Sequence, residues 1–226
     1  MLTYRIHLIR HGMAEDPQKK ICLGCNSDPA LTPEGTEELR QLMDTYQYPF
    51  AEKVYCSPLL RCKQTADILF PETEIEIMDE LKECDLGSFD GKPITELMEN
   101  PAFVGWVEGK CPPPGGEKSD EFANRIACAF DDIIHDMSKN HLIETAVVTH
   151  GTVIMGLCAM CGYPRQEMRY WATNSGCGYT LSTSVSLWMH DQCFEVISSL
   201  PFENREEDED EIPQLSEEER EWNFFE

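Results

Sequence analysis

The chain has 226 residues, 41% of them hydrophobic, which is enough for the core of one α/β domain but hardly for a second. Its formal net charge of −24 disfavours binding to nucleic acid or to an anionic membrane, although a few converging cations could still hold a small anion. Eleven cysteines without an export signal favour free thiols in a reducing compartment. We therefore expect a cytoplasmic protein whose partner is a small molecule.

The first predicted element is a buried strand over Tyr4–Ile9, in the N-terminal sequence MLTYRIHLIRHG. The apolar run before Arg10 and His11 is too short for a signal peptide, and no later stretch has the length of a membrane span. Strand and helix patterns then alternate, which predicts a three-layer α/β/α fold with a mostly parallel central sheet. The further predicted strands are Lys53–Cys56, Glu74–Ile77, Glu144–Thr149 and a closing hairpin of Tyr179–Leu187 and Cys193–Ser198.

Capping residues and apolar spacing predict the helices. Thr32 is a typical N-cap and Pro33 suits the first helical position, so a helix should begin there and run to about Tyr46. Apolar residues at helical spacing predict another helix over Glu117–Met137. The other predicted helices are Pro58–Phe70, Ile94–Met98 and Thr152–Cys161.

We expect residues 1–202 to form one domain, with a lid-like insertion at about 92–116. The stretch Asn100–Gly116 is predicted to be irregular and ends in a proline- and glycine-rich loop. Its apolar side chains either cover a pocket or only pin the segment to the body, and the sequence leaves both readings open. These side chains are Phe103, Trp106 and Val107.

Residues 203–226 are expected to form a flexible tail, because twelve acidic residues stand there against two arginines. Its aromatic residues Trp222, Phe224 and Phe225 could dock on a partner protein or on the domain itself, but a solvated tail fits this composition better.

Two Cys-x-x-Cys pairs, Cys22/Cys25 and Cys158/Cys161, allow a second reading of the cysteines. Four thiolates could bind zinc. The glycine-turn chemistry expected around a zinc knuckle is weak here, so small buried side chains are the favoured interpretation.

Two histidines occur in the same local context. One predicted strand leads into Arg10-His11-Gly12, and another leads into Thr149-His150-Gly151. Open α/β sheets bind ligands at the carboxyl ends of their strands, and a glycine after each histidine lets the backbone approach whatever the imidazole touches. One such pair is more often a plain turn, but two at equivalent strand ends indicate a shared site.

Two arginines, Arg10 and Arg61, are candidate ligands of a phosphate group. Phosphoryl transfer leaves charge on the equatorial oxygens, so the protein must supply fixed cations and donors. Arg10 precedes the first histidine, and Arg61 lies in the first turn of a predicted helix. Guanidinium groups suit phosphate, although either arginine taken alone could be a surface residue. The backbone N–H groups of Gly151 and Thr152, at a helix start, are further candidate donors.

A leaving alkoxide needs a proton, and a water must later lose one. One carboxyl group with a raised pKa can do both. Glu83 is our candidate, and by composition alone Asp79, Glu80 or Asp85 competes with it.

The motifs occur in a fixed order between residue 4 and about 200. They are RHG at 10–12, DPALTPEG at 28–35, SPLLRCKQTA at 57–66, LKECDLGSFDG at 81–91, GGE at 115–117 and THG at 149–151. Each is weak alone, but the ordered set resembles the histidine phosphatase superfamily, in the branch that contains cofactor-dependent phosphoglycerate mutase and alpha-ribazole phosphatase. The resemblance implies a phosphoglycerate mutase-like fold.

The resemblance also implies the roles of the site residues. His11 would be the nucleophile, Arg10, Arg61 and His150 would hold the phosphate, and Glu83 would donate and accept the proton. Attack requires a neutral His11, whereas a charged His150 would help to bind phosphate. No metal or cofactor is expected. The further implied substrate-binding residues are Gly12, Ser27 and Gly151.

The sequence departs from the family pattern at several points. Pro17 stands where relatives often have a phosphate-binding asparagine, and Met13 where they often have Glu or Gln. Mutases of the family have an arginine after the acid glutamate and a basic insertion, whereas this chain has Cys84 and, over Asn100–Gly116, only Lys110 as a cation. The phosphoryl group of a phosphorylated intermediate would therefore be transferred to water.

We accordingly expect a phosphatase that hydrolyses a small phosphomonoester, with alpha-ribazole 5'-phosphate suggested by the resemblance. A general sugar-phosphate or phosphoserine phosphatase is comparable. The alternatives are phosphoglycerate mutase-type phosphoryl transfer and a non-catalytic binding or scaffold protein that acts through the acidic, aromatic tail.

Overall fold

The computed structural model describes residues 2–14 and 20–203. Pro17 and the acidic tail after residue 203 lie outside the described residues, so the expectations for them stay predictions. No helix among the described residues is both long and apolar enough to span a membrane.

The described residues form a central sheet of seven strands in the order β4-β3-β5-β1-β7-β8-β6, with a separate pair, β2 and β9. The strands are β1 Tyr4–Arg10, β2 Tyr46–Gln47, β3 Val54–Cys56, β4 Ile75–Ile77, β5 Glu144–Thr149, β6 Gly162–Tyr163, β7 Gly178–Thr183, β8 Phe194–Leu200 and β9 Phe202–Glu203. The helices are α1 Pro33–Thr45, α2 Leu60–Leu69, α3 Ile94–Leu97, α4 Pro101–Val107, α5 Ser119–Asn140, α6 Gly151–Cys161 and α7 Val185–Asp191.

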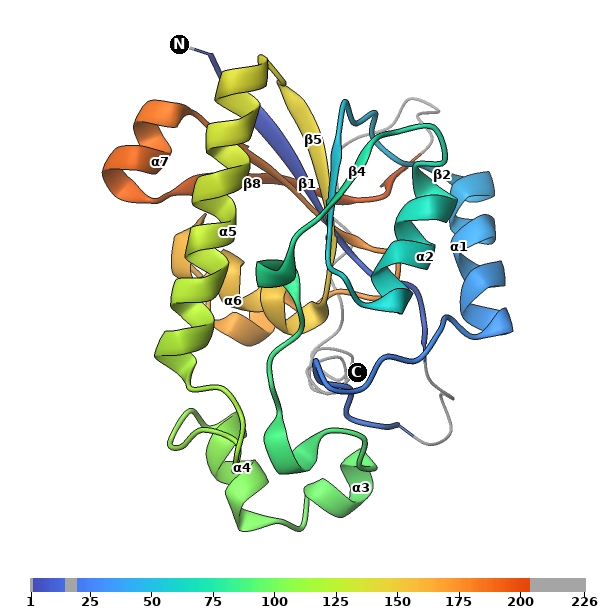
Figure 1. Ribbon diagram of the computed structural model, residues 1–226, viewed down its shortest axis with the longest axis vertical. Coiled ribbons are helices and arrows are strands. Elements are labelled where there is room, and N and C mark those ends of the chain that lie inside the picture. Colours follow the sequence, from blue (N-terminus) through green and yellow to red (C-terminus); the bar gives the residue numbers. More distant parts are fainter. Residues whose placement is uncertain (1, 15–19, 204–226) are drawn as a thin grey trace.

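The sheet lies between two helical layers. Helices α5, α6 and α7 lie on one side of it and α1 and α2 on the other, while α3 and α4 lie together at one end of the molecule (Figure 1). β4, β3, β5 and β1 pair in parallel, and β7 joins β1 and β8 antiparallel. The predicted three-layer fold with a mostly parallel sheet is therefore confirmed.

The N-cap and the first turn of α1 are formed by the residues predicted from the sequence. Thr32 caps α1, because its hydroxyl accepts a hydrogen bond from the N–H of Gly35 at 2.9 Å, and Pro33 occupies the first turn. The apolar face of α5 is buried along its length, including Phe122, Ile126 and Phe130. Such a stripe is what fixes a surface helix to a sheet.

The predicted strand Tyr179–Leu187 is wrong in its second half. β7 ends at Thr183, and the hydroxyl of Ser184 accepts a hydrogen bond from the N–H of Leu187 at 3.2 Å, which caps α7. The helix buries Trp188. The antiparallel pairing of β7 with β8 was predicted correctly, but a helix and not a tight turn connects them.

The prediction that Asn100–Gly116 is irregular is also wrong in part, because α4 occupies Pro101–Val107. The side chain of Asn100 accepts a hydrogen bond from the N–H of Ala102 at 2.9 Å, and Pro101 begins the helix. An Asn-Pro start is a helix signal, and here it prevails over the glycines and prolines that follow.

The closest backbone approach in the sheet predicts a stability effect. A Cβ at Gly178, which pairs with Ile9, would collide with the carbonyl oxygen of Leu8. We expect Gly178→Ala to cost about 1–3 kcal/mol, because rigid backbone must move. Thermal unfolding should show a Tm lower by roughly 2–4 °C per kcal/mol, whereas Ser182→Ala on the same strand should unfold close to wild type. An unchanged Tm for Gly178→Ala would contradict the strand spacing.

Candidate active site

The pairing of β1 with β5 brings the two His-Gly motifs together. The strands run parallel and end with Arg10 opposite Thr149. The first residue after each strand is a histidine, so the two histidines lie at the same level. The N–H of His11 donates to the carbonyl of Thr149 at 2.9 Å, and the ring centroids of His11 and His150 lie 5.1 Å apart. The shared site predicted from the two strand ends is therefore present in the fold.

Both ring nitrogens of His11 have hydrogen-bond partners, which fix the ring and its tautomer. Its Nδ1 lies 2.7 Å from the carbonyl oxygen of Gly12, which can only accept, so Nδ1 carries the proton. Its Nε2 accepts a hydrogen bond from Nε of Arg61 at 3.2 Å. Burial, and then the charges of Arg61 and Arg10, hold the pKa of His11 well below its ordinary value of 6.5. The imidazole is thus neutral, with a lone pair on Nε2.

Gly12 serves this arrangement with both backbone groups. Its carbonyl fixes His11, and its N–H donates to the hydroxyl of Thr65 at 2.9 Å. A Cβ at this position would press on the side chain of Leu39. The substrate-binding role expected for Gly12 stays a prediction, because both backbone groups already have partners inside the protein.

The two arginines are buried, so neither is the surface residue that sequence reasoning allowed. Arg61 donates to the carbonyl of Ser27 at 2.7 Å and to that of Gly24 at 3.2 Å. Arg10 donates to the carbonyl of Thr173 at 2.7 Å, and its guanidinium lies against Gly151 at the start of α6. Carbonyl partners fix both cations without neutralising them.

His150 is buried beside this pair. Its Nε2 is hydrogen-bonded to the hydroxyl of Ser57 at 2.8 Å, and the Sγ of Cys62 lies 3.4 Å away. Burial, followed by the charge of Arg61, lowers the pKa of His150 well below 6.5. In the ligand-free protein burial and the neighbouring cation therefore favour the neutral ring, and a charged His150 that helps to bind phosphate stays a prediction. Sequence reasoning gave Ser57 and Cys62 no role.

Glu83 is the only one of the four competing carboxylates that is buried. Its Oε1 accepts a hydrogen bond from the N–H of Cys84 at 2.7 Å, and the hydroxyl of Thr152 also bonds to it. Burial raises its pKa above the ordinary 4.5, against the opposing effect of these hydrogen bonds and of Arg61. Asp79, by contrast, is 72% exposed and pairs with Lys82.

An ion pair that we did not foresee holds the segment carrying Glu83. Arg125 on α5 donates to both carboxylate oxygens of Glu117, at 2.9 and 2.8 Å. The same guanidinium donates to the carbonyls of Glu80 at 2.6 Å, Lys82 at 2.9 Å and Glu83 at 3.4 Å. Glu117 belongs to the GGE motif. Arg125 lies 42 residues after Glu83, so nothing local in the sequence predicts its contact with that segment.

Ser27 lies in a loop shaped by Asp90, whose carboxylate accepts from the N–H groups of Gly24, Asn26 and Ser27 at 2.9–3.2 Å. Ser27 meets the site through its carbonyl oxygen, which Arg61 contacts. A role for its hydroxyl stays a prediction.

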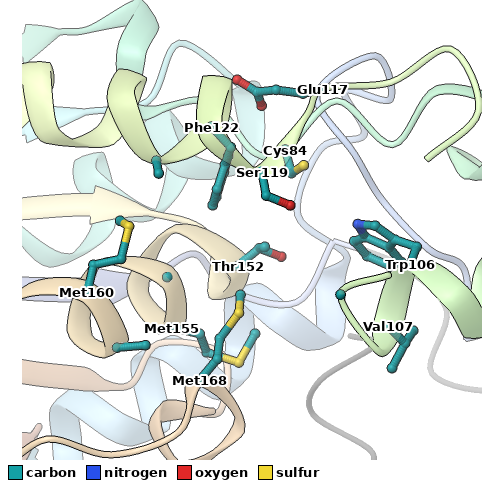
Figure 2. A pocket seen from close by; sticks show the side chains of 14 residues that line it. Cys84, Trp106, Val107, Glu117, Ser119, Phe122, Thr152, Met155, Met160 and Met168 are labelled. Carbon is teal, nitrogen blue, oxygen red and sulfur yellow. The ribbon is translucent and has the colours of Figure 1, made fainter. Parts of the chain in front are cut away.

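A pocket of about 250 Å³ lies between α4, α5 and α6, and two of its lining residues, Cys84 and Thr152, hydrogen-bond to Glu83. Trp106 and Val107 line it, whereas Phe103 is buried with its ring 5.3 Å from that of Phe89. Both readings of the apolar residues on this segment therefore hold, each for different side chains. Figure 2 shows Thr152 pointing into the pocket from α6, with Trp106 facing it from α4.

The structure describes all four cysteines of the two Cys-x-x-Cys pairs, and each has a free thiol. Among the described residues, no group of three or more His, Cys, Asp or Glu side chains is arranged to hold a metal ion. Burial raises the pKa of the Cys158 thiol, and that of Cys161 to about 11. Both thiols stay protonated at neutral pH.

The geometry of His11 predicts its protonation. Because its pKa lies below 6.5, we expect a neutral ring with the proton on Nδ1 at pH 6.5, where an unfolded histidine is about half charged. Nitrogen-15 chemical shifts of histidine-labelled protein, assigned by comparison with His11→Gln, would show this, and unfolding in urea should restore an ordinary titration. Half-protonation of His11 near pH 6.5, or a proton on Nε2, would contradict the structure.

Comparison with known proteins identifies the family of this chain. The model of the histidine phosphatase superfamily, branch 1, matches residues 6–191. The broad-specificity phosphatase of Saccharomyces cerevisiae is 30% identical over 171 residues, 72% of each chain. A 2,3-bisphosphoglycerate-dependent phosphoglycerate mutase of Parvibaculum lavamentivorans is 28% identical over 177 residues, 71% of this chain and 80% of the mutase.

A solved structure gives the same result for the fold. The alpha-ribazole phosphatase of Shigella flexneri superposes with a TM-score of 0.67 at 22% identity, covering 85% of this chain and 94% of that one. Relatives of this chain thus include both phosphatases and mutases. The chain belongs to the histidine phosphatase superfamily, branch 1.

Proposed function

We propose that this protein hydrolyses small phosphomonoesters through a phosphohistidine on His11. The observation that carries the proposal is the state of His11: a buried, neutral imidazole, fixed through Nδ1 and presenting Nε2 beside the Arg61 guanidinium. A nucleophile must be unprotonated, and the phosphate that it attacks must be held by cations.

In the first step, Arg10 and Arg61 would hold the phosphate oxygens, with the α6 N-terminus and His150 nearby. Nε of Arg61 would turn its hydrogen bond from Nε2 of His11 to a phosphate oxygen, which frees the lone pair of Nε2. Nε2 then attacks phosphorus, the N–P bond forms and the bond to the ester oxygen breaks. Glu83, whose raised pKa favours the protonated form, gives its proton to the leaving oxygen. The alcohol leaves and Glu83 is a carboxylate.

In the second step, a water attacks the phosphorus of the phosphohistidine. Glu83 takes a proton from this water, the N–P bond breaks and inorganic phosphate leaves. Both His11 and Glu83 return to their starting states, so atoms and protons balance over the cycle. The same carboxyl acts as acid and then as base. Its raised pKa allows this, because both the protonated and the charged form can then take part in the cycle.

Hydrolysis is favoured over mutase chemistry because no second anion site is apparent among the described residues. Cys84 stands next to Glu83, and burial raises the pKa of its thiol, so it is neutral. Lys110 is 69% exposed and pairs with Glu108 at 2.7 Å. The similarity to a broad-specificity phosphatase supports the same choice, while the mutase relative keeps phosphoryl transfer as the alternative.

Alpha-ribazole 5'-phosphate is our candidate substrate, and the apolar pocket next to Glu83 would take its ring system. Phosphoserine and sugar phosphates are the comparators. We also propose that residues 1–202 form the catalytic domain, with 92–116 as its lid. A non-catalytic scaffold role is less well supported, because a scaffold does not need a buried acid and a buried neutral histidine that face the same two arginines.

Removing the nucleophile tests the mechanism. We expect His11→Ala to lower kcat for 4-nitrophenyl phosphate by on the order of 10⁴ or more, because no other residue is placed to form the N–P bond. His135→Ala, which removes an exposed histidine on α5, is the matched control and should retain full activity. Substantial turnover by folded His11→Ala protein would sink the mechanism.

Replacing the acid separates its role from binding. Glu83→Gln should slow alkyl phosphates roughly 10²–10⁴-fold, because an alkoxide leaves poorly without a proton, and should slow 4-nitrophenyl phosphate far less. Steady-state and burst kinetics on both esters measure the difference.

Asp85→Asn is the control for that experiment, since it changes the neighbouring carboxylate in the same way. Equal losses on both esters would point instead to a shared step, such as activation of water. No change on either ester in Glu83→Gln would show that another carboxylate is the acid.

A further inference from the structure

The pocket beside Glu83 has a distinctive lining. Its lining includes Thr152 and Cys84, which both hydrogen-bond to Glu83, so the pocket lies next to the proposed acid. The rest is mainly apolar and rich in thioether and aromatic groups, which lie around the gap between Thr152 and Trp106 (Figure 2). These side chains are Trp106, Val107, Phe122, Met155, Met160 and Met168.

The pocket offers no cation to a ligand. None of its lining residues among those described is a lysine, arginine or histidine. Its one charged lining residue, Glu117, is already bound at both oxygens by Arg125, at 2.9 and 2.8 Å. A second phosphate or a carboxylate placed here would lose its hydration without gaining a partner, which is costly.

We infer that this pocket binds the organic group of the phosphomonoester and selects one that is apolar and uncharged. The inference rests on the proposed function, since it assigns the part of the substrate that leaves with the ester oxygen. Trp106, Met155 and Met168 are the residues that set this specificity. A flat ring can stack on Trp106, and thioethers adapt to an aromatic or alkyl group at little cost.

The size of the pocket limits this organic group. At about 250 Å³ it is smaller than the pockets of roughly 300–1,000 Å³ that hold drug-sized ligands. A small ring system or a short alkyl chain is therefore the class of group that it takes. Esters that carry a second anion close to the ester oxygen are disfavoured.

A homologous series of n-alkyl phosphates, from ethyl to hexyl, tests this inference. Their leaving groups have nearly the same basicity, so a change in kcat/KM reports burial and not chemistry. We expect kcat/KM to rise about fourfold with each methylene until the pocket is full. 3-Phosphoglycerate, of similar size but with a carboxylate, should be slower than butyl phosphate.

Two variants tie the effect to the pocket. Met168→Gln and Trp106→Ala should each flatten the chain-length dependence, with about a tenfold loss or more on hexyl phosphate and little change on ethyl phosphate. Met189→Gln alters a methionine that is 72% exposed on α7 and serves as the matched control. Thermal unfolding identifies a misfolded variant, and the other variant then carries the test.

The outcomes separate this inference from the proposed function. Failure to hydrolyse any ester, 4-nitrophenyl phosphate included, would overturn the proposed function and the inference with it. Hydrolysis of 4-nitrophenyl phosphate without a rise along the alkyl series, or faster hydrolysis of 3-phosphoglycerate than of butyl phosphate, would overturn the inference alone. A rise that Met168→Gln and Trp106→Ala leave unchanged would place the apolar contact elsewhere.

Discussion

The in-register parallel pairing of β1 with β5 is the constraint on which the site depends. Arg10 lies opposite Thr149, so both strands end at the same level and their histidines meet. A slip of one residue would turn every side chain of a strand to the other face of the sheet. Such a slip is opposed because Leu8, Ile9, Val147 and Val148 are buried between the sheet and the helices that cover its two faces.

This pairing also determines the electrostatics. It places Arg10 and the two histidines together, and α2 adds the buried Arg61. Desolvation and the charges of these arginines hold both imidazoles in the neutral form. Burying a cation is costly unless its donors find acceptors, and here the carbonyls of Thr173, Ser27 and Gly24 accept hydrogen bonds from the two guanidinium groups. The result is a fixed positive site with a neutral nucleophile, in a protein whose net charge is −24. A small dianion fits such a site, whereas the surrounding acidic surface repels larger polyanions.

Much of this was readable from the sequence, because the signals are local. Alternation and caps predicted β1, β5 and the start of α1. Ser184 has β-branched neighbours, which favour a strand, but its side-chain cap prevails and α7 forms. Contacts between distant segments carry no local signal: Ser57 meets His150 across 93 residues, and Arg125 meets the carbonyl of Glu83 across 42. For the same reason the neutral state of His150 needed the burial and neighbouring charges that only the fold supplies.

The central claim is that phosphate passes through His11, and the most direct measurement is to trap it there. A substrate labelled in its phosphate is mixed with the enzyme, quenched in alkali within one turnover, and the labelled peptide is mapped by mass spectrometry. The account predicts base-stable, acid-labile phosphate on Nε2 of His11, forming at least as fast as the alcohol is released. Phosphate on another residue, or alcohol released in a burst with no phosphate on the protein, would contradict it.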